Sequence, residues 1–309
     1  MISNQLNDEF KKQLVNHFTG EFKFNYTLAP LTWLKVGGHA EVLYKPNGIE
    51  DLSKFLAYLP EGIDVNFIGA GSNLLIRDIG IPGITIKLGR AFSYIDLHSQ
   101  TLHIGAATLN YNLSKFCLEN EIGGLEFISG IPGSIGGGVA MNAGCYGKEF
   151  KDIVKKITAI NRKGEILSLT PEEMQFHYRG YGLNEKLLFV SVEFKWEHKN
   201  KKDIQNILEN IKQQRKATQP INQKTAGSTF ANPTGNYKAW QLIDGVGMRG
   251  FKVGDAQIST LHSNFLINNG NASSYDLEKL AELARKKVYD QTGIMLEWEV
   301  IRLGNNKQM

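Results

Sequence analysis

GGLEFISGIPGSIGGGVAMNAG, residues 123–144, contains eight glycines and a single charged side chain. Such a glycine-dense backbone can direct several amide N–H groups at one anion, because no Cβ atom blocks the approach. Residues 130–137 are therefore a potential cradle for a diphosphate. A tight loop that only lets two sheets pack closely would have a similar composition. This segment alone leaves both interpretations open.

A second glycine loop, GAGSNL at residues 69–74, precedes it. A dinucleotide-binding fingerprint needs a third small residue and a long helix directly afterwards. Here Leu74 occupies that position, and residues 78–83 contain two glycines and a proline, so we reject a Rossmann fold. The loop is either an ordinary turn or an anion site made by its N–H groups and the Ser72 hydroxyl.

The composition is that of a globular protein, with 42% hydrophobic and 21% charged residues among 309, enough for two or three domains. The net charge of +4 suits an acidic small molecule and gives no reason to expect nucleic acid. The N-terminus lacks a signal-peptide core, and no hydrophobic run reaches membrane-spanning length. We expect a cytoplasmic protein that does not bind membranes.

The chain has two cysteines, Cys117 and Cys145, too few for a disulfide scaffold, which indicates a reducing compartment. Cys117 shares helical spacing with Leu113 and is expected to be buried. Cys145 would be reactive only if it faced an anion site. The seven histidines are scattered, and we expect no metal site.

Strand and helix patterns mingle along the chain, which predicts an α+β fold. Hydrophobic runs predict strands at residues 40–44, 65–68, 83–88, 102–106, 153–160, 165–169, 187–196, 265–267 and 295–303. Helical spacing predicts helices near residues 52–59, 109–117, 204–211, 239–243 and 273–293. A polar helix and a connector are expected within residues 1–25, and a loop over 25–38.

Six motifs follow one another in a set order, and together they carry a resemblance. They are TWLKVGG at 32–38, GAGSNLL at 69–75, GIPGSIGG at 130–137, Tyr178 with Arg179, AGS with NP within 226–233, and LEWEV at 296–300. The chain resembles the UDP-N-acetylenolpyruvoylglucosamine reductases, also called UDP-N-acetylmuramate dehydrogenases, from about residue 25 to 304. The resemblance implies an FAD enzyme that reduces UDP-N-acetylglucosamine enolpyruvate with NADPH in peptidoglycan precursor synthesis.

The resemblance also implies an FAD-binding region of two α+β subdomains, of the vanillyl-alcohol-oxidase (PCMH) type, and a C-terminal α+β substrate-binding domain. We assign residues 1–88 and 89–200 to the two subdomains and 201–309 to the third domain, with the final strand returning to the FAD region. Arg179 lies too close to the strand predicted from residue 187 for the tyrosine loop of one family type, so the chain resembles the second type.

In the family the FAD diphosphate lies against the two glycine loops, and the cofactor is not covalently bound. The matching positions here are Val36, Gly69, Ala70, Gly71, Ser72, Asn73, Leu74, Gly130, Pro132, Gly133, Ser134, Gly136, Asn142, Ala143 and Gly144.

The catalytic residues of the family match Arg179, Ser228 and Glu299. Hydride addition to a conjugated enol ether drives negative charge into the substrate carboxylate, and a fixed guanidinium at Arg179 can stabilise that charge through two-point contact. Ser228 would protonate the α-carbon. A buried Glu299 would have a raised pKa and donate a hydrogen bond.

Each of these residues also has a structural alternative. Arg179 could form only a surface ion pair, and Ser228 could be a turn or helix-cap residue. Glu299 could pair with a basic group such as Arg302.

Three further residues, Tyr178, Asn232 and Arg249, match positions that contact the UDP-sugar. Ala231 stands where the family usually has a lysine, and Arg249 replaces another usual lysine, although arginine also binds phosphate.

Two other functions remain open on the sequence. One is a flavin oxidase of the same fold acting on a sugar or hydroxy acid. Such oxidases often tether FAD through a histidine, for which His39 is the candidate here, against the alternative of a neutral histidine in a turn. The other is a non-catalytic nucleotide-sugar binding module. We expect the protein to be a monomer.

Overall fold

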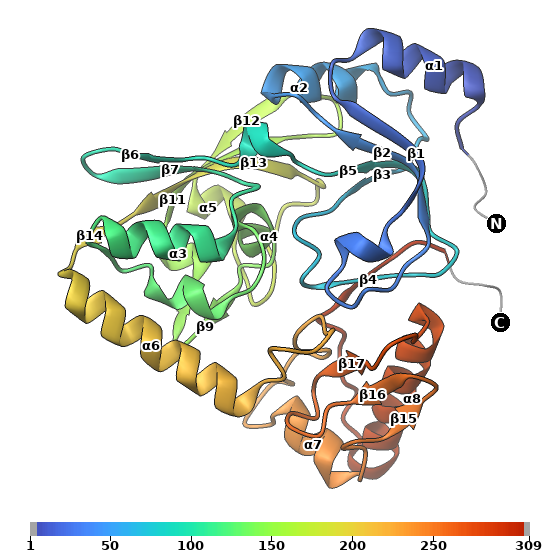
Figure 1. Cartoon of the computed structure of the whole chain (residues 1–309), viewed down its shortest axis with the longest axis vertical. Coiled ribbons are helices and arrows are strands. Elements are labelled where there is room, and N and C mark those ends of the chain that lie inside the picture. The colour runs from blue at the N-terminus through green and yellow to red at the C-terminus, as the bar shows by residue number, and fades with distance from the viewer. Residues whose placement is uncertain (1–4, 306–309) are drawn as a thin grey trace.

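The computed structural model describes residues 5–305, which form three regions, each built around a sheet (Figure 1). The first region contains a four-stranded sheet in the order β1-β2-β5-β3. Its elements are α1 (Asp8–His17), β1 (Glu21–Thr27), β2 (His39–Lys45), α2 (Ile49–Tyr58), β3 (Val65–Phe67) and β5 (Ile81–Ile86). Leu14 of α1 and the buried face of α2 pack on this sheet in one hydrophobic cluster.

The second region contains a five-stranded antiparallel sheet in the order β12-β11-β13-β7-β6. Its strands are β6 (Ile95–Leu97), β7 (Thr101–Gly105), β11 (Val154–Ile160), β12 (Ile166–Leu169) and β13 (Leu188–Lys195). The helical elements are α3 (Asn110–Glu119), η3 (Glu126–Gly130), α4 (Ile135–Ala140), α5 (Pro171–Met174) and α6 (Lys201–Thr218). α6 packs on η3 and α3, along the edge of this region (Figure 1).

Short ladders complete the second region: β8 (Ile122–Gly123) pairs with β14 (Glu197–His198), and β9 (Gly144–Cys145) pairs with β10 (Lys148–Glu149). Three single helical turns are η1 (Ala29–Leu31), η2 (Arg90–Phe92) and η4 (Phe150–Asp152).

The third region contains β15 (Lys252–Val253), β16 (Ala256–Ile258) and β17 (Leu266–Asn268), with α7 (Ala239–Gly245) and α8 (Ser274–Thr292). α8 begins with a capping box, in which the Ser273 side chain accepts from the Asp276 amide, and ends at Gly293 in the left-handed conformation. The helix buries Leu277, Leu280, Ala281, Ala284 and Val288 on one face, as its spacing predicts.

The last strand leaves the third region and returns to the first glycine loop. β18 (Ile301–Leu303) pairs in parallel with β4 (Leu74–Ile76), the strand that directly follows the loop. Asn73 reinforces the junction, because its Nδ2 donates to the Glu299 carbonyl at 3.0 Å. Residues more than two hundred positions apart in the chain therefore lie next to each other beside the first glycine loop.

The α+β class is confirmed, but several predicted elements differ. Residues 21–27 form the edge strand β1 and not a connector; many of its side chains are exposed, which hides a strand pattern. β6 was not predicted. The predicted strand over 295–303 is a strand only at its end, because residue 298 bridges to Phe230 instead.

The strand predicted at 83–88 begins earlier, at Ile81, and so includes Pro82. The register of β5 against β2 shifts at this point, and such an irregularity accommodates a proline. The Gly83 amide donates to the buried carboxylate of Glu41 at 2.8 Å. The domain limits at 88 and 200 stay a prediction.

None of the helices in the described part of the chain combines the length and hydrophobicity needed to cross a bilayer.

Candidate active site

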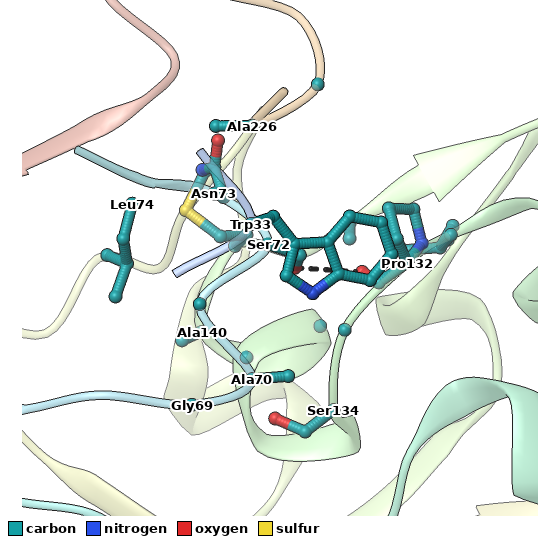
Figure 2. Close-up of a pocket in the computed structure, with 18 of the residues that line it drawn as sticks. Trp33, Gly69, Ala70, Ser72, Asn73, Leu74, Pro132, Ser134, Ala140 and Ala226 are labelled. Carbon is teal, nitrogen blue, oxygen red and sulfur yellow. Dashed lines mark hydrogen bonds between the residues drawn. The ribbon is translucent and has the colours of Figure 1, made fainter. Parts of the chain in front are cut away.

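A cavity of about 470 Å³ lies where the three regions meet, and both glycine loops line it. Figure 2 shows the first loop, with Gly69, Ala70 and Ser72, facing the second, with Pro132 and Ser134. The Ser72 hydroxyl donates to the Pro132 carbonyl at 3.2 Å and holds the loops together. A cavity of this size is typical of a small-molecule or cofactor site.

The first loop keeps its amides available to a ligand. Gly71 has φ +72°, and its carbonyl accepts from the Trp33 amide at 3.0 Å. The N–H groups of residues 70–73 donate to no acceptor in the part of the chain that the structure describes. Free amides on a left-handed turn form an anion-binding concavity.

The second loop shapes the cavity, and some of its amides are already engaged. The amides of Ile135 and Gly136 already donate to the carbonyls of Thr108 and Ala106, both at 2.9 Å. Gly133 has φ +121°, and a Cβ there would lie 2.7 Å from the Ser72 Oγ. A side chain at this position would therefore enter the space between the loops, so the cradle depends on the absence of one.

Most residues predicted to bind the cofactor line this cavity. They are Gly69, Ala70, Gly71, Ser72, Asn73, Leu74, Gly130, Pro132, Gly133, Ser134, Gly136, Ala143 and Gly144. Two do not. Val36 is buried in the core of the third region, and Asn142 is buried with its Nδ2 donating to Glu149 and to the His177 carbonyl, each at 3.0 Å. The set that remains fits an elongated cofactor with a diphosphate.

We expect Gly71→Ala to abolish tight cofactor binding. A Cβ at Gly71 would lie 2.1 Å from the Leu31 carbonyl oxygen, so the loop must move. A loss of about 1.4 kcal/mol already weakens FAD binding tenfold, and we expect at least that. The measurement is the FAD content per chain after purification, from the ratio of visible to ultraviolet absorbance.

Gly62→Ala is the matched control, because Gly62 also has a positive φ, +92°, but a Cβ at this position would have no heavy atom within 4 Å. Both variants share the backbone strain, and only Gly71→Ala has the steric clash. Full FAD occupancy in Gly71→Ala would contradict the role of this loop.

A smaller polar cavity of about 240 Å³ adjoins the first. Arg179, Ser228 and Glu299 line both cavities, so the structure brings together the three predicted catalytic residues at the junction. They come from distant segments: the loop before β13, the loop after α6, and the residues preceding β18.

Arg179 and Glu299 are in direct contact. The Arg179 Nε donates to the Glu299 Oε1 at 2.7 Å, and the guanidinium carbon lies 4.7 Å from the centroid of the Tyr178 ring. Arg179 has φ +60°, a conformation that is costly for a residue with a side chain and is concentrated at functional sites. The guanidinium is thus held at the junction of the cavities.

Two opposite effects act on the pKa of the Glu299 carboxyl group. Burial raises the pKa of this carboxyl above its ordinary value, and the Arg179 guanidinium opposes part of the rise. Arg302 does not pair with Glu299; it lies 3.5 Å from a Glu278 carboxylate oxygen. The raised direction is the one the sequence predicts, and the alternative that Glu299 pairs with a basic group also holds, with Arg179 in place of Arg302.

Ser228 follows Gly227, which has φ +81°, and bridges to Phe265. No helix begins at this serine, so the helix-cap alternative does not hold. Its hydroxyl has no hydrogen-bond partner among residues 5–305. It is free to contact a ligand at the junction.

The predicted substrate residues separate into two groups. Tyr178 and Asn232 line the polar cavity. Arg249 lines neither cavity; it forms an ion pair with Asp244, and its Nη1 donates to the carbonyls of Thr260 and Leu261 at 2.7 and 3.1 Å. Sequence reasoning missed Lys238, Trp240 and His262, which line the polar cavity although no motif marks them.

Two other candidates from the sequence have structural roles. Cys145 lines the larger cavity, but burial raises the pKa of its thiol to about 11, and its Sγ donates to the Phe127 carbonyl at 3.1 Å. A protonated thiol is a poor nucleophile. His39 lies beside Thr27 on the first sheet, with 3.0 Å between Nε2 and Oγ1, and does not line the cavity, so a covalent tether there is not favoured.

A glycine-lined cavity that opens onto a guanidinium, a carboxyl and a hydroxyl, in a chain that matches an FAD binding domain, indicates a flavin-dependent oxidoreductase. The model of an FAD binding domain matches residues 40–170, and the model of the UDP-N-acetylenolpyruvoylglucosamine reductase C-terminal domain matches residues 219–303. The chain therefore belongs to the UDP-N-acetylenolpyruvoylglucosamine reductase family, and its cofactor is FAD.

Individual relatives support this family assignment. The chain is 54% identical over 289 residues to the UDP-N-acetylenolpyruvoylglucosamine reductase of Orientia tsutsugamushi (strain Ikeda), covering 92% of this chain and 95% of the relative. Identity to that of Rickettsia massiliae (strain Mtu5) is 50% over 290 residues, covering 93% and 97%. The crystal structure of the Thermus caldophilus reductase superimposes with a TM-score of 0.80 at 31% identity, covering 93% and 99%.

Proposed function

We propose that this chain reduces UDP-N-acetylglucosamine enolpyruvate to UDP-N-acetylmuramate with NADPH, in peptidoglycan precursor synthesis. The observation that carries the proposal is the junction of the two cavities, where Arg179, Ser228 and Glu299 face both. The two glycine loops would hold FAD, and the cofactor would supply the hydride that adds to the β-carbon of the enol ether. The polar cavity holds the substrate.

Arg179 binds the substrate carboxylate in this proposal. Its Nε contacts Glu299, so on binding substrate the guanidinium exchanges one carboxyl partner for another, or shares both. Negative charge grows on the substrate carboxylate during the reaction, and a guanidinium that is already positioned stabilises it without reorganisation. Stacking on Tyr178 restricts the motion of the side chain.

Ser228 delivers the proton to the α-carbon. Its hydroxyl is free of internal partners in the described chain and faces the junction. A serine is a weak acid, so its contribution depends on placement next to the developing carbanion. Glu299 stands on the same junction, where its protonated form can donate a hydrogen bond to the charged intermediate.

We expect Glu299→Gln to change how stability depends on pH. A folded-state pKa above the ordinary 4.5 means that the native state holds the proton more tightly than the unfolded chain. This contribution is fully present below the unfolded pKa and is lost as the pH rises through the folded pKa. The free energy of unfolding of the original holoprotein, minus that of the variant, should therefore fall with rising pH.

Urea unfolding of both FAD-loaded proteins at several pH values from about 4 to 8 measures this difference. A difference that rises with pH would contradict the effect of burial, and would show instead that the ion pair with Arg179 lowers the pKa of Glu299.

The proposed function is tested with purified protein under anaerobic conditions. NADPH should bleach the visible flavin band, and the enolpyruvyl UDP-sugar should restore it with one product molecule per NADPH. Bleaching without restoration would favour an oxidase of the same fold, and no bleaching would favour a non-catalytic binding module. We propose that the enzyme acts as a cytoplasmic monomer, which sedimentation of the holoprotein and cell fractionation test.

A further inference from the structure

The polar cavity continues beyond the three predicted catalytic residues. Its lining includes Lys238, Trp240 and His262, together with Asn232. Under the proposed function, the enolpyruvyl group of the substrate lies at Arg179, and the rest of a long nucleotide sugar must extend along this cavity. Two phosphates with negative charge then need a cation in its wall.

The basic residues in this lining are Arg179, Lys238 and His262, and two of them are not available to a phosphate. Arg179 is paired with Glu299 at 2.7 Å. Burial lowers the pKa of His262, and its Nδ1 accepts from the Asn264 amide at 3.3 Å, which leaves a neutral ring at pH 7. Arg249 lies outside the lining and is paired with Asp244.

Lys238 is the third basic residue of this lining. Within residues 5–305 no carboxylate lies within ion-pair distance of its ammonium group. The side chain is exposed, so water and not protein solvates the charge. An exposed ammonium group at the wall of a polar cavity can bind a phosphate without first breaking an ion pair.

The backbone that directly follows Lys238 is held in place. The next residue, Ala239, is buried in the core of the third region, and its amide donates to the Asn232 Oδ1 at 3.1 Å. Trp240 is fixed by its carbonyl, which accepts from the Ser263 hydroxyl at 2.7 Å. The side chain of Lys238 therefore projects from a fixed point beside the cavity.

We propose that Lys238 binds the phosphate groups of the UDP-sugar and thereby sets the affinity for this substrate. The assignment rests on the proposed function, because it takes the position of the enolpyruvyl group from it. Lys238 acts on binding and not on the chemical step, since the phosphates are remote from the reacting carbons.

Lys238→Ala is expected to raise the KM for the enolpyruvyl UDP-sugar by roughly 10- to 100-fold, the range for loss of a charge-assisted contact, with kcat within about threefold. Lys238→Arg should recover most of the loss. Lys252→Ala removes an exposed lysine from the same region outside both cavities, and it should match the original protein.

A binding measurement separates a phosphate contact from a structural effect. Titration calorimetry of the holoprotein with UDP and with uridine gives a ratio of affinities, and Lys238→Ala should lower this ratio at least about tenfold while uridine binding is unchanged. If Lys238→Ala does not fold, Lys238→Gln, which keeps a long polar side chain, replaces it in both measurements.

The proposal fails if the KM of Lys238→Ala equals that of Lys252→Ala, if kcat falls as much as kcat/KM, or if the UDP-to-uridine ratio is unchanged. A rise in KM confined to Arg249→Ala would also overturn it. Failure of the original protein to turn over the enolpyruvyl substrate would instead count against the proposed function, so the two failures are distinct.

Discussion

Arg179→Lys is expected to slow the oxidation of the reduced holoprotein by the enolpyruvyl substrate by about a hundredfold or more, which corresponds to roughly 3 kcal/mol of lost charge stabilisation. A lysine keeps the charge but loses the planar fork that contacts both carboxylate oxygens. It also loses the stacking on the Tyr178 ring. The FAD content and the rate of bleaching by NADPH should change little, since the glycine loops are untouched.

Stopped-flow absorbance follows the two half-reactions separately. Arg90→Lys, an exposed arginine outside both cavities, is the control and should leave both rates unchanged. Near-normal oxidation in Arg179→Lys would show that point charge alone suffices, and the proposed two-point contact would then be wrong.

Ser228→Ala should have the other large effect. The variant removes the proposed acid, and general acid catalysis contributes about 10²- to 10⁴-fold. We expect NADPH to reduce the bound FAD at the normal rate, whereas the enolpyruvyl substrate reoxidises it more slowly by a factor in that range. The backbone around Gly227 does not depend on the serine hydroxyl, which has no internal partner in the described chain.

Ser99→Ala, an exposed position between β6 and β7, serves as the matched control. Equal slowing of both half-reactions in Ser228→Ala would point to a positioning role and count against proton donation.

Much of the fold was predictable, because local patterns carry it. The hydrophobic spacing of α2, α6 and α8 marks their buried faces, and Ser273 and Gly293 mark the ends of the last helix. β1 was missed because an exposed edge strand takes its hydrogen bonds from β2 and needs little hydrophobic patterning of its own.

The site was predictable in its components but not in its orientation. Val36 and Asn142 match positions of the family that bind the cofactor, yet neither lines the cavity. Val36 is buried in a hydrophobic core, and the Asn142 side chain donates to Glu149. The Arg249 guanidinium forms an ion pair with Asp244 of α7, and no sequence pattern predicts that pairing. Lys238 carries no motif and became visible only through the cavity that it lines.

The amino-acid sequence by itself determined the family and the glycine loops and predicted the candidate reactive groups, because these depend on residue type and order. Only the tertiary structure decided which side chains meet. The parallel pairing of β18 with β4 carries Glu299 to the first loop, where the Arg179 guanidinium reaches it. Such contacts join distant segments, so their geometry follows from the packing of all three regions and from no local stretch of chain.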